Sequence, residues 1–108
     1  MPTTYKVLGQ VAPVAVTLTP LYATPGGTQA VASTLSICNR GLSTTYRVAV
    51  QVAAAAITNS QYVVYDAAIN ANDTVMLTLG ISLGATDVVS VYAGTANVSF
   101  SLFGAEIL

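Results

Sequence analysis

Apolar and polar residues alternate along most of the 108-residue chain, in short runs that are separated by turn-forming residues. In the clearest run, Thr45–Val52, every second residue from Tyr46 onward is a tyrosine or a valine, and the residues between them are polar or small. A period of two is typical of a β-strand with one buried face, and the 3.6-residue period of an amphipathic helix does not recur. The pattern predicts eight strands: Thr4–Gln10, Val14–Thr19, Ala30–Cys38, Thr45–Val52, Tyr62–Tyr65, Thr74–Ile81, Val88–Ala93 and Asn97–Phe103.

The residues between these runs favour turns. We expect Pro20 to end the second strand, because proline cannot donate a hydrogen bond to a sheet. We expect Pro25–Gly27 to open a loop, where glycine can adopt positive φ. Asn39–Gly41 predicts a tight hairpin connection between the third and fourth strands. The alanine-rich segment Ala53–Ile57 is compatible with either a loop or one short helix.

Strands at this spacing predict an all-β fold, a single antiparallel β-sandwich of about seven or eight strands, jelly-roll or immunoglobulin-like. The chain has the length of one domain, so residues 1–108 are expected to form it alone. The residues that we expect in the core are Val16, Leu18, Leu35, Ile37, Val48, Val50, Leu77, Leu79, Val89, Val91, Val98 and Phe100.

Charge is scarce in this sequence and apolar residues are abundant. Hydrophobic residues make up 54% of the chain and charged residues 6%, a balance that excludes an intrinsically disordered protein. Three Lys and Arg residues stand against four Asp and Glu, so neither nucleic acid nor an anionic membrane is an expected partner. Prolines and polar residues interrupt the long uncharged stretches, and the first residues do not form a signal peptide. We therefore expect a protein that is made in the cytoplasm and not exported.

No catalytic, cofactor-binding or metal-binding residues are expected. The chain has no His, which is the usual base for a serine or cysteine nucleophile, and its only lysine is Lys6. The spacing of the carboxylates matches neither a calcium loop nor a paired acid–base site. The three aspartates are expected to bond backbone N–H groups at turns. The four carboxylates are Asp66, Asp73, Asp87 and Glu106.

Other polar and aromatic residues each leave two interpretations. Cys38 is expected to be a small buried hydrophobic residue rather than a reactive thiol. Arg40 and Arg47 flank the expected hairpin, where they either form a solvated rim or pair with an acid on a neighbouring chain. The six tyrosines belong either to the core and to subunit interfaces, which we favour, or to a surface that stacks against carbohydrate. The absence of Trp argues against the carbohydrate surface.

The shortage of charge itself points to an assembly. A freely diffusing sandwich with seven charged residues would be poorly soluble and would expose unguarded strand edges. We therefore expect much of its surface to be covered by identical neighbours.

Six segments together resemble a family of small virion structural proteins of tailed bacteriophages: Tyr5–Gln10, Leu21–Gly27, Ile37–Gly41, Arg47–Val50, Ala71–Thr74 and Thr95–Phe100. Members of this family are described as structural or tail-fibre-like, and similar small β-domains serve as capsid cement or decoration proteins. The resemblance implies a virion component without catalytic residues.

The resemblance and the scarce charge together predict a capsid cement or decoration protein. We expect it to form a homo-oligomer, with a trimer favoured, and to contact other virion proteins such as the major capsid protein. Its place would be the virion, assembled in the host cytoplasm. The alternatives are a structural subunit of the tail, baseplate or fibre and, less favoured, a receptor- or sugar-binding module.

Overall fold

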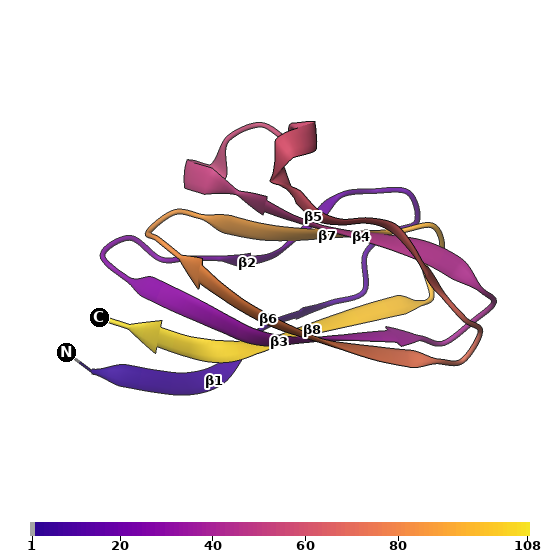
Figure 1. Cartoon of the computed structure of the whole chain (residues 1–108), viewed down its shortest axis with the longest axis horizontal. Coiled ribbons are helices and arrows are strands. Elements are labelled where there is room, and N and C mark those ends of the chain that lie inside the picture. The colour runs from indigo at the N-terminus through magenta and orange to yellow at the C-terminus, as the bar shows by residue number, and fades with distance from the viewer. Residues whose placement is uncertain (1) are drawn as a thin grey trace.

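The computed structural model describes residues 2–108 as two four-stranded antiparallel sheets packed face to face (Figure 1). Two single-turn 3-10 helices, η1 (Val52–Ala54) and η2 (Asn59–Gln61), lie in the connection from β4 to β5. The predicted all-β sandwich is confirmed. The strands are β1 (Thr3–Val11), β2 (Thr19–Ala23), β3 (Gln29–Asn39), β4 (Thr44–Gln51), β5 (Tyr62–Ile69), β6 (Thr74–Leu83), β7 (Val88–Ala93) and β8 (Val98–Ile107).

The strand order is that of a jelly roll. The first sheet runs β1-β8-β3-β6 and the second sheet runs β2-β7-β4-β5. The first half of the chain therefore pairs in reverse order with the second half: β1 with β8, β2 with β7, β3 with β6 and β4 with β5. A long hairpin of chain that is rolled into two sheets gives this order, which selects the jelly roll over the immunoglobulin arrangement. Both chain ends lie at one end of the sandwich (Figure 1).

The core lies between the two sheets, where Phe100 of β8 packs edge-on against Tyr46 of β4 with ring centroids 6.4 Å apart. Three further expected residues, Val50, Leu77 and Leu79, are half-buried and pack against this core. Alternation along the strands therefore predicted most of the inward-facing positions. The expected core residues that are fully buried are Leu35, Ile37, Val48, Val89, Val91, Val98 and Phe100.

The prediction of a strand at Val14–Thr19 is wrong. This segment is the connection from β1 to β2, and Val16 in it is 66% exposed with a φ of 57°. The backbone N–H of Val16 donates to the carbonyl of Ala93, so the segment is held by a single long-range bond rather than by a ladder. The expectation that Val16 and Leu18 lie in the core is therefore wrong: Val16 is exposed, and the half-buried Leu18 does not pack against the core cluster.

Pro20 does not end a strand but lies inside β2. This strand is at the edge of the second sheet, where a residue without an N–H group is tolerated. The pairing with β7 shifts register between Pro20 and Tyr22, which marks a bulge at the proline. The second strand therefore begins at Thr19 and includes the proline that was expected to end it.

Two connections also differ from expectation. Asn39–Gly41 does not close a hairpin, because β3 and β4 belong to different sheets and the turn crosses between them. The buried amide of Asn39 holds this crossing by donating to the carbonyls of Leu42 and Asn70 at 2.9 and 3.0 Å. The segment Ala53–Ile57, for which a loop and a helix were both open, is a loop that begins with η1.

A bulge at Ser33 changes which side chains of β3 face outward. Register shifts between Ala32 and Thr34 in the pairing with both neighbours. Alternation along Ala30–Cys38 predicts Val31 on the same face as Leu35 and Ile37, but the bulge places it on the outer face, where it is 37% exposed. The expectation for Val31 is therefore wrong.

Candidate functional site

The four carboxylates do not converge. Asp73 accepts a hydrogen bond from the backbone N–H of Thr74. Asp87 accepts from the backbone N–H groups of Gly84 and Ala53. Both aspartates therefore hold turns, as the sequence indicated. Within residues 2–108, no group of three or more Cys, Asp or Glu side chains is placed to hold a metal ion.

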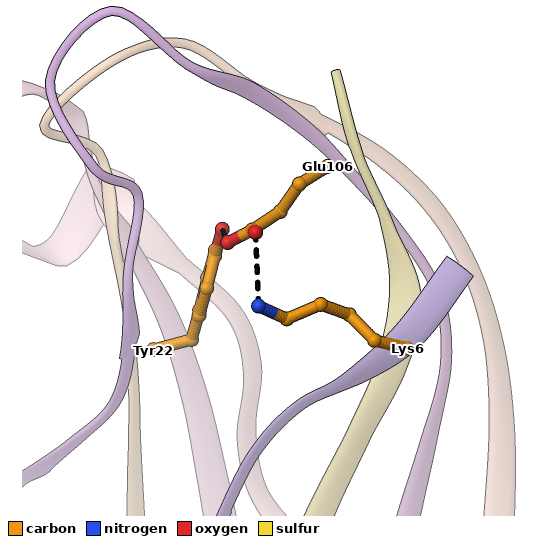
Figure 2. Close-up of polar contacts among 3 residues, drawn as sticks. All are labelled: Lys6, Tyr22 and Glu106. Carbon is orange, nitrogen blue, oxygen red and sulfur yellow. Dashed lines mark hydrogen bonds and ion pairs between the residues drawn. The ribbon is translucent and has the colours of Figure 1, made fainter. Parts of the chain in front are cut away.

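Glu106 forms a three-residue cluster that joins the two sheets (Figure 2). Its Oε1 accepts a hydrogen bond from Lys6 Nζ of β1 at 2.9 Å, and its Oε2 accepts from the Tyr22 hydroxyl of β2 at 2.6 Å. The bond from Tyr22, and then that from Lys6, lowers the pKa of Glu106 below its ordinary value. Burial and the neighbouring carboxylate raise the pKa of Tyr22. Both carboxylate oxygens of Glu106 are therefore paired within the chain.

Arg47 stands at the centre of a second cluster, on the outer face of the second sheet. Its Nε donates to Asp66 Oδ1 at 2.6 Å and its Nη2 to Asp66 Oδ2 at 3.3 Å. Its guanidinium also lies over the rings of Tyr65 and Tyr92, 4.2 and 4.3 Å from their centroids. The hydrogen bond to Asp66 raises the pKa of Arg47, and the same bond lowers the pKa of Asp66. Arg47 is therefore paired within its own chain.

A bulge in β5 makes the Arg47 cluster possible. Tyr46 pairs with Ala67 and Val48 pairs with Val64, so the single residue Arg47 lies opposite both Tyr65 and Asp66. Asp66 has a φ of 52°, a conformation that Asp tolerates better than most residues. The predicted strand ended at Tyr65, and Asp66 was expected to bond backbone in a turn; this expectation is wrong, because Asp66 lies inside β5 and pairs with Arg47.

The outer face of the first sheet carries an open apolar depression of about 700 Å³ across β1, β8 and β3. Tyr5 and Val7, which border it, are 84% and 47% exposed. No outward-facing strand residue of this sheet is charged, since Lys6 is turned to Glu106. The residues that line the depression are Thr3, Tyr5, Lys6, Val7, Val31, Ser33, Phe103, Gly104, Ala105 and Ile107.

Two of the six tyrosines lie in the core, and the other four lie on the surface, where either a subunit interface or a carbohydrate-stacking surface was considered. Tyr22 and Tyr46 are buried, as a core role requires. Tyr5 and Tyr65 are exposed, and Tyr62 and Tyr92 are half-buried on the surface. The edge-to-face pair of Tyr62 and Tyr65, with centroids 5.0 Å apart, could not be foreseen because it depends on two register shifts between β4 and β5, one on each side of Val48.

The remaining candidates lie apart from these clusters. Arg40 directly follows β3, and its Nε donates to Ser99 Oγ of β8 at 3.0 Å. Cys38, which was expected to be a small buried residue, is half-buried near the end of β3.

Across the part of the chain that the structure describes, no helix has the length and apolar character needed to cross a membrane.

Comparisons with protein-family models, with curated proteins and with solved structures found no match to this chain.

Proposed function

We propose that this chain is a structural subunit of a bacteriophage virion, a capsid cement or decoration protein that works as a homotrimer. The observation that carries the proposal is the outer face of the first sheet, which combines exposed apolar side chains with no outward-facing charge. Such a surface is suited to packing against protein rather than to contact with water. The jelly roll also occurs among viral capsid domains, and the resemblance of the sequence to small phage proteins points in the same direction.

The charged residues of the chain do little to keep one copy of the protein apart from another. Four of the seven form two ion pairs, Lys6 with Glu106 and Arg47 with Asp66. The aspartates of the turns are bonded to backbone, as described above. The repulsion that normally keeps small proteins apart is therefore weak, which favours assembly.

The strand β6 is the least protected edge of the molecule. The edges of the second sheet carry guarding features, Pro20 in β2 and the charged Asp66 in β5, whereas Lys6 of β1 is paired with Glu106. β6 is ten residues long, contains neither charge nor proline, and exposes 59% of Met76. A register shift opposite Ser33 interrupts its pairing with β3 at Leu79 and Gly80, where Gly80 has a positive φ. An edge of this kind is a template for pairing with another chain.

A three-fold ring needs two different complementary patches on every subunit. The first sheet offers them at its two edges, with β6 on one side and β1 on the other. In the proposed trimer the β6 edge of one copy, at Met76, meets the β1 edge of the next copy, at Val7. A contact of this type is stable when it buries roughly 1,200–2,000 Å².

Sedimentation equilibrium tests the proposed trimer directly. The wild-type protein is expected at three times the 11.0 kDa mass of the chain. Met76→Lys and Val7→Lys place a charge in the contact and are expected to give monomers. The matched control is Val63→Lys, because Val63 is 52% exposed on β5 of the other sheet, and this variant is expected to remain a trimer. A monomeric wild-type protein would overturn the trimer.

The location on the particle is tested by quantitative gel densitometry of purified virions. Hundreds of copies per particle fit a cement protein. A few to a few dozen copies would instead favour the tail, baseplate or fibre, where the same uncharged edges would bundle sandwiches along an axis. Absence of the chain from the virion would overturn the proposal.

A further inference from the structure

Tyr62 and Tyr65 form an aromatic corner on the outer side of β5. Their ring centroids lie 5.0 Å apart and the ring planes meet at 82°, so one ring stands almost perpendicular to the other. Tyr65 is 58% exposed. With Asn59 of η2 the two rings border an open hollow of about 390 Å³. The loop that carries η2 projects beyond the second sheet, so the hollow lies on the opposite side of the sandwich from the proposed trimer contacts (Figure 1).

The corner is held in place from both ends. On one side, the backbone N–H of Thr58 donates to Gln61 Oε1 at 2.8 Å and the backbone N–H of Gln61 donates to the carbonyl of Thr58 at 3.1 Å, which holds the turn that carries Asn59. On the other side, the ring of Tyr65 rests on the guanidinium of Arg47. The bidentate pair with Asp66 and the ring of Tyr92 hold that guanidinium in turn. A ligand that binds here therefore needs to order little of the protein, which favours affinity.

Polar groups at the rim of the hollow are free to bind. Among residues 2–108, the side-chain amide of Asn59 and the hydroxyls of Tyr62 and Tyr65 make no hydrogen bond within the chain. The amide offers two donors and an acceptor, and each phenol offers a donor and an acceptor. The hollow thus combines flat apolar faces with uncharged hydrogen-bonding groups.

Charge narrows the class of ligand. Arg47 lies directly behind the ring of Tyr65, so its positive charge opposes a second cation on the front of that ring. Asp66 neutralises Arg47 through two hydrogen bonds, so the site also lacks a free positive charge for an anion. A neutral ligand with a flat apolar face and a rim of hydroxyl groups matches what remains.

We propose that this corner, made of Asn59, Tyr62 and Tyr65, is a binding site for a neutral pyranose sugar. The C–H face of the pyranose stacks on the exposed ring of Tyr65, and its edge lies against Tyr62. The sugar hydroxyls bond the amide of Asn59 and the two phenol groups. The site does not depend on the proposed virion function or on trimer formation, because none of its residues lies in the first sheet.

Saturation-transfer difference NMR tests the site with four neutral probes: cellotriose, maltotriose, mannotriose and chitotriose. At least one is expected to receive saturation, strongest at the C–H protons of one ring face. Tyr65→Ala and Tyr62→Ala are each expected to raise the Kd of that sugar at least tenfold. Tyr65→Phe keeps the ring and is expected to have a smaller effect than Tyr65→Ala. Far-ultraviolet circular dichroism checks that each variant is folded.

The matched control is Tyr5→Ala, since Tyr5 is the most exposed tyrosine and lies on the other sheet. This variant is expected to bind the sugar like the wild type. The proposal is overturned if none of the four probes binds, or if Tyr5→Ala weakens binding as much as Tyr65→Ala. A polyproline decamer that binds in place of the sugars, and is lost in Tyr65→Ala, would equally overturn the carbohydrate assignment. Because sedimentation measures the trimer separately, failure of one proposal does not imply failure of the other.

Discussion

The hydroxyl of Tyr22 donates a 2.6 Å hydrogen bond to the carboxylate of Glu106 and so joins the two sheets of the sandwich (Figure 2). Tyr22 lies in β2 of the second sheet and Glu106 in β8 of the first. The same carboxylate also binds Lys6 of β1. One acidic side chain therefore ties three strands together at the end of the molecule where both termini lie.

Removing the hydroxyl of Tyr22 tests this tie. Tyr22→Phe is expected to lower the free energy of unfolding by on the order of 1 kcal/mol, because a buried ring loses its bond to a carboxylate. Urea denaturation measures the change. Tyr65→Phe is the control: its hydroxyl has no partner within the described residues, so it is expected to change stability by less than about 0.5 kcal/mol. Equal losses of stability in the two variants would contradict a stabilising hydrogen bond from Tyr22 to Glu106.

The lowered pKa of Glu106 predicts how stability depends on pH. In the unfolded chain the carboxyl takes up its proton near the ordinary value of 4.5, whereas the folded protein keeps it ionised to lower pH. The unfolded state therefore binds more protons as the pH falls, and the stabilisation, complete above this value, is lost on acidification. Glu106→Gln is expected to flatten the fall of the urea midpoint between pH 6 and pH 3. If the urea midpoints of Glu106→Gln and of the wild type fell identically with pH, Glu106 would not be the source of the pH dependence.

The core prediction concerns Phe100, whose side chain is fully buried and packs edge-on against Tyr46. Phe100→Ala leaves a cavity between the sheets and is expected to cost about 3–5 kcal/mol. Val63→Ala is the control on an exposed position, and it is expected to cost less than about 0.5 kcal/mol. Chemical denaturation of both variants measures the difference, and a loss below about 1 kcal/mol for Phe100→Ala would place the core elsewhere.

Alternation predicted the strands because it reports directly which side chains face the core. Seven of the eight predicted runs overlap observed strands, although Tyr62–Tyr65 covers only the first half of β5. The residues of Thr45–Val52 that were expected to point inward do so from Tyr46 to Val50. The same signal fails at Val14–Thr19. An alternating segment that has no neighbouring strand to pair with becomes a loop, and pairing partners are set by the topology rather than by local sequence.

The surface clusters could not be predicted because bulges create them. A strand with an extra residue reverses which side chains face outward, and nothing in the alternation marks where the extra residue is inserted. The bulge opposite Arg47 brings Tyr65 and Asp66 to the same guanidinium, and the bulge at Ser33 turns Val31 outward. Residue types alone suggested only that tyrosines and arginines would be found on some surface.

The bulge at Ser33 also explains why residue 104 is glycine. There the backbone of β3 approaches β8 so closely that a Cβ on Gly104 would collide with the carbonyl of Val31. That neighbour is backbone and cannot move aside without shifting the strand. Gly104→Ala is therefore expected to lower the free energy of unfolding by about 1–3 kcal/mol, the usual cost of an overpacked site.

Gly26→Ala is the matched control for this prediction. An added Cβ at Gly26 meets nothing within 4 Å, and this glycine does not have a positive φ. The control variant is expected to unfold within about 0.5 kcal/mol of the wild type. Urea denaturation of the two variants separates crowding at the bulge from a general cost of replacing glycine. If both variants lost the same stability, the close approach of β3 and β8 at Val31 would not be what requires a glycine at position 104.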